Sequence, residues 1–134
     1  MKELTLKQAA EFCYGKLSPE TADGVITGVQ MDSRQVKPGD LFVAIKGEKA
    51  DGHDFVSMAA KSGASAALVS RPVEAEIPTI LVSDTVRAYG DLAAAYRERA
   101  GVTVIGITGS VGKTTTKEMT ACMLSRTYHT ARTE

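Results

Sequence analysis

The sequence has few cysteines, no net charge and no long apolar run. Two of its 134 residues are cysteine. Cys13 and Cys122 have no spacing typical of a disulfide or metal site, so both are expected to be reduced thiols packed on apolar helix faces. Lys and Arg number 16, as do Asp and Glu, which leaves no basic surface for general nucleic-acid binding. Apolar runs such as residues 41–45 are too short to span a bilayer.

Length and composition are typical of a small globular chain. Hydrophobic residues make up 43% and charged residues 24% of the sequence, a balance that supports a packed core. A chain of this length holds one domain, or one small domain and part of another. Residues 1–13 lack the apolar stretch of a secretion signal, so we expect a cytoplasmic protein with no membrane insertion.

Strands and helices are expected to alternate in the first part of the chain. A capping box of Thr5 and Gln8 begins a helix over residues 6–13. Asp54 is expected to cap a helix that has Phe55, Met58 and Ala59 inward and stops at Gly63. Strands are expected at residues 25–31, 41–45, 66–70 and 79–83. The alternation predicts an α/β fold.

A second unit is expected to follow. Asp84 is a good N-cap for a helix that ends at Gly101, with a predicted buried stripe of Val86, Tyr89, Ala93, Tyr96 and Ala100. A buried strand at residues 102–107, a glycine-rich loop and a helix at 113–126 come next, and residues 128–134 are read as the beginning of a further strand. The predicted organisation is therefore a first domain at residues 1–84, a connecting helix at 85–101, and the start of an incomplete domain at 102–134.

Residues 106–115 have the pattern of a phosphate-binding loop between a buried strand and a helix. Glycines allow backbone N–H groups to approach phosphates, and the helix start adds partial positive charge. Lys113 is the predicted catalytic residue that reaches the β- and γ-phosphates, and the Thr114 hydroxyl is the predicted Mg²⁺ ligand. The usual pattern has glycine where this chain has Ile107. The residues expected to bind ATP are Thr108, Gly109, Ser110, Val111, Gly112, Lys113, Thr114 and Thr115.

This loop is expected to be half of a nucleotide site. Such sites also need an acidic metal ligand on another strand and a group that contacts the γ-phosphate. Only 21 residues follow Lys113, and most of them belong to the loop's own helix. We therefore expect a P-loop ATPase domain that is truncated in this chain, and we expect the 134 residues alone to be inactive.

The loop at residues 108–115 resembles that of the Mur ligases, the ATP-dependent amide ligases of peptidoglycan precursor synthesis. The resemblance extends to residues 32–34, 38–44, Gly47 and 51–55, which are similar to the N-terminal UDP-binding domain of the members that add the third amino acid and D-Ala-D-Ala. Residues 116–119 are more like the D-Ala-D-Ala-adding branch. The substrate-binding residues that this resemblance implies are Asp32, Ser33, Arg34, Gly47, Asp51, Gly52 and His53.

The resemblance implies a three-domain ligase, of which this chain holds the UDP-binding domain and the opening of the central domain. The implied reaction phosphorylates the terminal carboxylate of UDP-MurNAc-tripeptide with ATP and Mg²⁺, and the D-Ala-D-Ala amine then attacks the acyl phosphate. The remaining metal and ATP ligands, including the family's carbamylated lysine, are expected beyond Glu134. The missing central and C-terminal domains are therefore implied partners.

Other interpretations of these residues stay open. The residues alone favour a surface turn over a pyrophosphate site for Ser33 and Arg34, and the family resemblance reverses this preference. Residues 51–54 fit a uridine pocket and a turn with a helix cap equally well, and Asp54 is assigned mainly to the cap. A third-residue-adding ligase, a stand-alone UDP-sugar-binding module, and a kinase or GTPase with a phosphate loop are the alternative functions.

Overall fold

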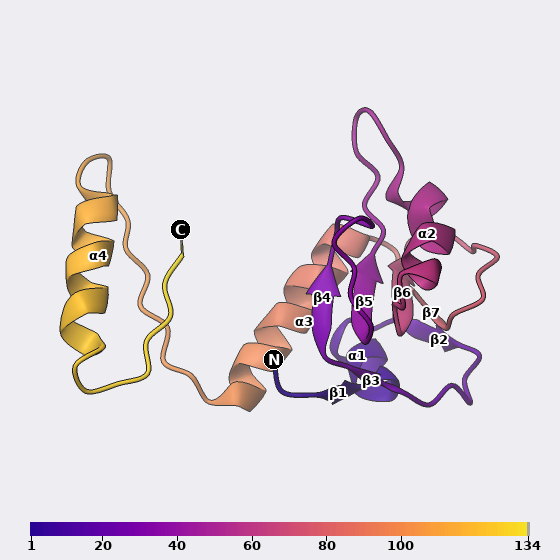
Figure 1. The fold of residues 1–134 in the computed structure, drawn as a ribbon, viewed down its shortest axis with the longest axis horizontal. Coiled ribbons are helices and arrows are strands. Elements are labelled where there is room, and N and C mark those ends of the chain that lie inside the picture. Colours follow the sequence, from indigo (N-terminus) through magenta and orange to yellow (C-terminus); the bar gives the residue numbers. More distant parts are fainter. Residues whose placement is uncertain (134) are drawn as a thin grey trace. The chain divides into compact units, whose positions relative to one another are not determined.

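The structure is a computed structural model that describes residues 1–133, and it divides into two compact units (Figure 1). The first unit is Met1–Gly101 and the second is Val102–Glu134, of which Glu134 lies outside the described residues. The boundary follows Gly101, whose left-handed backbone (φ 64°) ends a long helix. That helix, expected to be a connector, belongs to the first unit.

The first unit is built on a five-stranded sheet with the order β2-β7-β6-β5-β4. Four neighbouring strands are parallel, and β2 pairs antiparallel with β7 at one edge. A separate pair, β1 (Leu4–Thr5) and β3 (Val25–Ile26), is antiparallel. The strands of the large sheet are β2 (Lys16–Ser18), β4 (Gly28–Gln30), β5 (Asp40–Val43), β6 (Ala66–Val69) and β7 (Thr79–Leu81).

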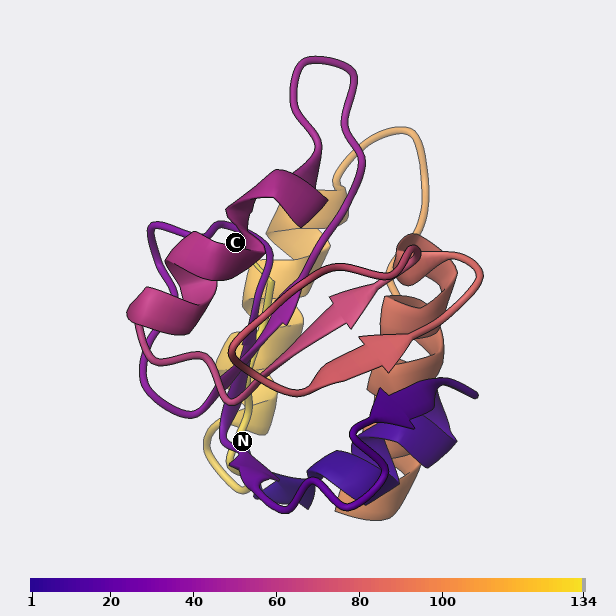
Figure 2. The ribbon, with the colours of Figure 1, turned by 90° about the vertical axis from the view of Figure 1, so that its right-hand side faces the viewer.

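Helices cover both faces of this sheet, as Figure 2 shows. Helices α1 (Leu6–Phe12) and α3 (Thr85–Ala100) pack on one face, and α2 (Val56–Lys61) packs on the other. Alternate residues of β5 serve the two cores, because successive side chains of a strand point to opposite faces. Leu41 and Val43 join the core under α1 and α3, whereas Phe42 joins the core under α2. The predicted α/β fold is confirmed.

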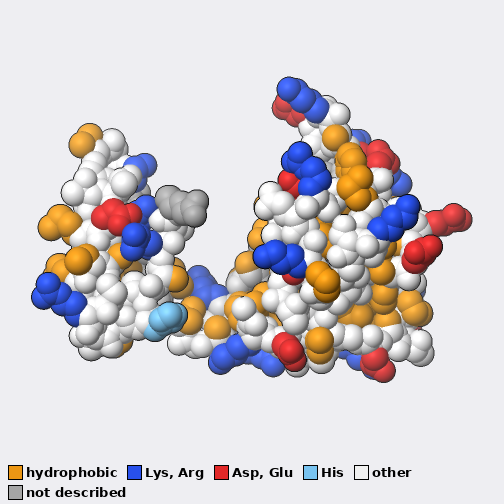
Figure 3. Space-filling model, viewed as in Figure 1, with side chains coloured by type: hydrophobic (Ala, Val, Ile, Leu, Met, Phe, Trp, Pro, Cys, Tyr) orange, Lys and Arg blue, Asp and Glu red, His pale blue; other side chains and the backbone are white. Residues whose placement is uncertain are grey.

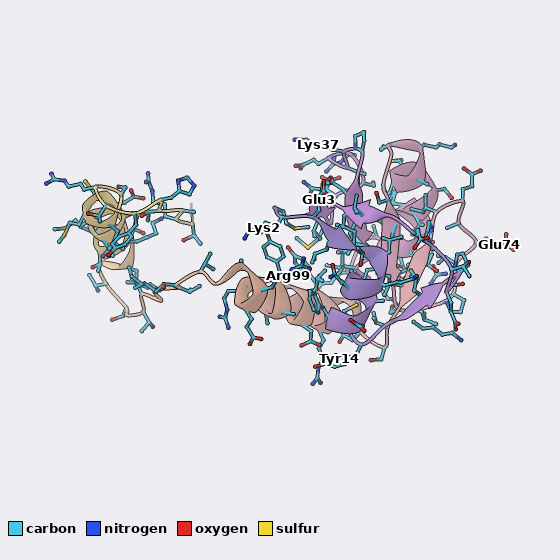
Figure 4. All side chains as sticks on the ribbon, turned by 90° about the horizontal axis from the view of Figure 1, so that it is seen from below. Lys2, Glu3, Tyr14, Lys37, Glu74 and Arg99 are labelled. Atoms are coloured by element: carbon cyan, nitrogen blue, oxygen red, sulfur yellow. The ribbon has the colours of Figure 1, made fainter. Side chains whose placement is uncertain are left out.

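Helix α3 is tied to the N-terminal segment by side chains near its end. Tyr96 accepts a hydrogen bond from the backbone N–H of Lys2 at 2.6 Å, and Arg99 donates to Gln8 at 2.9 Å. Figure 4 shows Lys2 and Arg99 on these neighbouring segments. Because residues more than 90 positions apart meet here, α3 is an integral part of the first unit.

The two predicted helix starts that depend on local signals are confirmed. The Thr5 side chain accepts from the Gln8 backbone and the Gln8 side chain accepts from Thr5, which completes the capping box. Asp84 caps α3 by accepting from the backbone N–H groups of Val86 and Arg87. Cys13 is buried as expected, and this burial raises the pKa of its thiol.

The predicted helix cap at Asp54 is wrong. Asp51 caps instead, at the start of a 3₁₀ helix, η1 (Gly52–Phe55), and α2 begins afterwards at Val56 without a side-chain cap. Asp51 precedes η1 and accepts the backbone N–H of His53, whereas Asp54 lies within the first turn of η1. Met58 is exposed instead of inward, and Val56 takes the buried place.

The predicted buried stripe of α3 is correct at Tyr89 and Tyr96, which are half-buried against the core, and wrong at Val86 and Ala93, which are exposed. Val86 is 58% exposed, whereas Thr85, Ala88 and Leu92 are buried. The helix has apolar residues on two adjacent stripes, so its 3.6-residue period does not decide which one faces the sheet. The fully buried residues are Thr85, Ala88 and Leu92, and Tyr89 and Tyr96 pack beside them at the border of the core.

The second unit contains one helix, α4 (Lys113–Leu124), among its described residues. No strand forms at residues 102–107, where Val102, Val104 and Ile105 are exposed, and none forms at 128–133. A strand needs a neighbour for its backbone hydrogen bonds, and no described residue pairs with these segments. Helix α4 ends before Arg126, and Cys122 is exposed instead of packed.

No helix within residues 1–133 combines the length and the apolar character that a bilayer crossing requires.

Two substitutions on α3 test which of its faces is buried. Leu92→Ala should lower the free energy of unfolding by about 2 to 4 kcal/mol, because it empties a place in the core. Val86→Ala should change it by less than about 0.5 kcal/mol, because that side chain is in solvent. Urea denaturation followed by circular dichroism measures both. Equal losses for the two variants would contradict the observed face of α3.

Candidate functional site

The carboxyl ends of the four parallel strands lie at one edge of the sheet. Gln30 pairs with Phe42, Val43 with Leu68, and Val69 with Leu81, so the strands end nearly level. The loops that follow β4 and β5 carry all seven residues predicted to bind a UDP-linked substrate. In α/β folds this edge is where ligands bind, because the loops there are free of the sheet's hydrogen bonding.

Arg34 presents a charged group at this edge and is held in place by Asp32. The guanidinium donates to both carboxylate oxygens, from Nε to Oδ1 at 2.9 Å and from Nη2 to Oδ2 at 2.7 Å. The Arg34 backbone N–H also donates to Asp32 at 3.0 Å. These bonds hold the pKa of Asp32 well below its usual range. The Arg34 side chain is 83% exposed, so the guanidinium N–H groups that do not bond to Asp32, including both on Nη1, can bind an anion.

Ser33 lies between them but points inward. It is 8% exposed, and its hydroxyl donates to the Met58 sulfur at 3.4 Å. A direct bond from this hydroxyl to a phosphate requires that weak bond to break. Of the two residues predicted to contact a pyrophosphate, Arg34 is therefore the one that already faces solvent.

The loop after β5 closes on itself before η1. The Gly47 N–H donates to the Ala50 carbonyl and the Gly52 N–H to the Ile45 carbonyl, each at 2.9 Å. A side chain at Gly52 would lie 2.6 Å from the Ile45 nitrogen, so glycine is required for this close approach. This loop forms the tip of the first unit in Figure 1, and Figure 3 shows acidic and basic side chains there. The closed loop gives Gly47 and Asp51 fixed positions.

His53 is buried beneath this loop and has partners for both ring nitrogens. Its Nδ1 lies 2.6 Å from Asp51 Oδ1, and its Nε2 accepts the backbone N–H of Ser70 at 2.9 Å. Because an N–H only donates, this network assigns the ring proton to Nδ1, which donates to Asp51. The His53 backbone N–H and then its ring lower the pKa of Asp51 to about 2.

Arg71, which sequence reasoning missed, also reaches this edge. It follows β6, and its Nη2 lies 3.5 Å from Asp51 and 3.4 Å from Asp54. The only local signal was a Ser-Arg pair directly after a buried strand. Its neighbours in space come from a loop about 20 residues earlier, and a local pattern does not reveal such pairing.

The predicted phosphate loop, in the second unit, leaves open space above the helix start. Gly109 (φ 143°) and Gly112 (φ 79°) adopt backbone conformations that favour glycine. A side-chain carbon at Gly106 or Gly112 would meet nothing within 4 Å. No side chain within residues 1–133 caps α4, so its first N–H groups are free for an anion.

Lys113 and Thr114 line a hollow of about 240 Å³ beside this loop, together with Ile105, Ile107, Lys117 and Thr133. Lys117 donates to the Thr133 carbonyl at 2.8 Å and lies 3.5 Å from Glu118, so its charge is already paired. The eight residues Thr108 to Thr115 are all exposed. Free helix N–H groups, a lysine and a hydroxyl fit a nucleotide phosphate with its Mg²⁺.

Within residues 1–133, no group of three His, Cys, Asp or Glu side chains is arranged to hold a metal ion.

Comparison with known proteins identifies the family. The model described as "Mur ligase family, catalytic domain" matches residues 25–107. The chain belongs to the Mur ligase family. It is 45% identical over 130 residues to the UDP-N-acetylmuramoyl-tripeptide--D-alanyl-D-alanine ligase of Escherichia coli K12, a match that covers 97% of this chain and 28% of that protein. The chain thus spans less than a third of this relative's length.

A second branch of the family matches a shorter part of the chain. The UDP-N-acetylmuramoyl-L-alanyl-D-glutamate--2,6-diaminopimelate ligase of Bacillus licheniformis is 46% identical over 99 residues, which cover 72% of this chain and 20% of that protein.

Solved structures share the fold. A crystal structure of MurF from Acinetobacter baumannii has a TM-score of 0.87 and 40% identity over 95% of this chain and 28% of its own. The MurF ligase from Thermotoga maritima, crystallised in complex with ADP, has a TM-score of 0.65 and 40% identity over 74% of this chain and 23% of its own.

Acid titration tests the Asp51–His53 contact. The hydrogen bonds that lower the pKa of Asp51 stabilise the fold when the pH is above 3.8, the pKa of this group in the unfolded chain. This stabilisation is lost as the pH falls towards about 2. Asp51→Asn should therefore show a shallower loss of stability between pH 4 and 2 than the wild type, measured by thermal unfolding. Asp23→Asn, at an 89% exposed side chain, should keep the wild-type slope. A wild-type slope in Asp51→Asn would show that the contact contributes nothing.

Proposed function

We propose that this chain is the N-terminal part of a MurF-type ligase, which adds D-Ala-D-Ala to UDP-MurNAc-tripeptide. The match of the D-Ala-D-Ala ligase of Escherichia coli over 97% of the chain carries the proposal. The match to the diaminopimelate-adding relative covers only 72% of this chain. The alternative of a third-residue-adding ligase is therefore less well supported. ATP and Mg²⁺ are the proposed cofactors, and the remaining domains of the same enzyme are the proposed partners.

We propose a division of labour between the two units. The first unit would bind the UDP part of the substrate at the carboxyl edge of its sheet, through residues 32–34 and the loop at 47–53. The second would hold the ATP phosphates on residues 108–115. The exposed guanidinium of Arg34 and the start of α4, which has no side-chain cap, support these assignments. The ligase would act in the cytoplasm, where its nucleotide substrates occur.

In the proposed reaction, ATP phosphorylates the terminal carboxylate of the tripeptide, and the amine of D-Ala-D-Ala displaces phosphate from the acyl phosphate. Lys113 would stabilise the negative charge that develops on the transferring phosphoryl group. Thr114 would hold Mg²⁺, which shields the phosphate oxygens when it is bound. The backbone N–H groups at the start of α4 would orient the chain of phosphates.

Calorimetric titration of the 134-residue chain with UDP-MurNAc-tripeptide tests the first assignment. A charged hydrogen bond contributes about 1.5 to 3 kcal/mol, so Arg34→Ala should weaken binding about ten- to a hundredfold. Arg87→Ala, which removes an exposed arginine from α3, should leave the affinity unchanged. If a folded Arg34→Ala variant kept the wild-type affinity, Arg34 would be a residue of a surface turn that does not bind the substrate.

Turnover of the whole ligase tests the second assignment. Lys113→Ala should lower kcat about a hundred- to a thousandfold, because it removes a charge from the transferring group. The affinity for UDP-MurNAc-tripeptide should stay within about threefold, since that site is assigned to the other unit. Arg126→Ala, at an exposed position after α4, is the control with unchanged turnover. Equal damage to turnover and to UDP-substrate affinity would contradict the separation of the sites.

A further inference from the structure

Arg71 is a charged residue of the carboxyl edge that the proposed function does not use. It lies just after β6, whereas Arg34 lies after β4, and β5 runs between these two strands. Neighbouring strands of a sheet are about 4.8 Å apart, so the chain leaves β4 and β6 at points about 10 Å from each other. Both arginine side chains can therefore approach one ligand at the end of β5.

The contacts of Arg71 are weaker than those of Arg34. Its Nη2 lies 3.5 Å from Asp51 and 3.4 Å from Asp54, beyond the usual range of such hydrogen bonds. Arg34 instead bonds to Asp32 at 2.7 and 2.9 Å. Within residues 1–133 no group accepts from Nε or Nη1 of Arg71, and its side chain is 51% exposed. These N–H groups can bond to an acceptor from solution.

The backbone beside Arg71 has a fixed place. The Ser70 N–H donates to the buried ring of His53 at 2.9 Å, and this ring also contacts Asp51 at 2.6 Å. The Arg71 side chain therefore starts from a defined point next to the loop assigned to the substrate. Such a fixed start limits the conformational entropy that is lost when the side chain becomes ordered on a ligand.

The chemistry of the guanidinium indicates which ligand group it would take. The UDP part assigned to this edge carries a diphosphate, and phosphate oxygens accept charged hydrogen bonds. A planar guanidinium suits phosphate because it can donate two parallel N–H bonds. Asp51 and Asp54 engage only one nitrogen of Arg71, at long distances. A diphosphate can therefore replace these carboxylates as the acceptor.

We propose that Arg71 is a second arginine of the diphosphate site, which turns from Asp51 and Asp54 to a phosphate of the nucleoside diphosphate when the substrate binds. The proposal rests on the proposed binding of UDP-MurNAc-tripeptide at this edge. Arg34 and Arg71 then hold the diphosphate from the loops after β4 and β6. The Asp54 carboxylate competes with the phosphate for Arg71 and weakens binding.

Asp54 separates a direct contact of Arg71 with the substrate from a merely structural role. Within residues 1–133, Arg71 is the one partner of the Asp54 side chain, whereas Asp51 also contacts His53 and caps η1. If Arg71 binds phosphate, removal of the Asp54 charge frees Arg71 and strengthens binding. If Arg71 only ties the loop at residues 51–54 to the end of β6, removal of either partner weakens binding.

Calorimetry of the 134-residue chain with UDP-MurNAc-tripeptide measures these effects. Arg71→Ala should weaken binding about five- to fiftyfold, which is the loss of one charged hydrogen bond less the exposed ion pair that it replaces. Asp54→Asn should strengthen binding about two- to threefold, and this gain should be lost in a chain that also carries Arg71→Ala. Arg97→Ala and Asp23→Asn, at exposed positions elsewhere in the first unit, should keep the wild-type affinity.

UDP alone tests whether the diphosphate is the part of the substrate that Arg71 contacts. Because UDP carries this group without the sugar and the peptide, Arg71→Ala should weaken the binding of UDP by a factor similar to that for UDP-MurNAc-tripeptide. A loss confined to the whole substrate would place Arg71 at the sugar or the peptide and contradict the inference.

Three further results would overturn the inference while the proposed function stands, provided that Arg34→Ala weakens binding. They are wild-type affinity in a folded Arg71→Ala variant, no gain in Asp54→Asn, and a gain of the same size with and without Arg71. If Arg71→Ala does not fold, as judged by circular dichroism, the sign of the Asp54→Asn effect alone decides. A wild-type chain that binds neither UDP nor UDP-MurNAc-tripeptide would overturn the proposed function and the inference with it.

Discussion

The parallel pairing of β4, β5, β6 and β7 is the constraint on which the first unit depends. Parallel strands need crossovers, so every return connection runs from the carboxyl edge of the sheet to the opposite edge. All the loops that leave the strands therefore gather at one edge, and both faces of the sheet are left to helices. The alternation of β5 between two cores follows from the same arrangement.

Two side chains at the carboxyl edge of the sheet are held in place in different ways. Arg34 is exposed and held by a surface carboxylate, which keeps its direction while leaving the group solvated. His53 is buried and has both nitrogens engaged, so it holds the loop and not the ligand. A solvated charge is suited to an anion that exchanges with water, and a buried ring is suited to fixing backbone. The proposed phosphate loop would use a third kind of group, the backbone N–H groups at the start of α4, which no side chain among residues 1–133 caps.

The sequence predicted best those features that depend on near neighbours in the chain. The helix cap at Asp84 and the α/β class follow from local sequence patterns, and the structure confirms both. The loop before Lys113 was also predicted from a local pattern, and its binding of phosphate stays a prediction. The predicted buried stripe of α3 was wrong at Val86 and Ala93 because two apolar stripes compete on this helix and only the sheet decides between them. The strand at residues 102–107 was wrong because its hydrogen bonds need a neighbour. Arg71 was missed because its partners lie in another loop.

The central claim is that the carboxyl edge of the sheet in the first unit binds the UDP part of the substrate. Backbone ¹H–¹⁵N spectra of the 134-residue chain, recorded while UDP-MurNAc-tripeptide is added, test it most directly. The account predicts that the amide signals that shift are those of residues 32–34, 47–53 and 70–71, with residues 102–133 unchanged. The claim would be contradicted if the signals of these loops stayed unchanged and shifts appeared instead at α1 and β2, or only at residues 106–115.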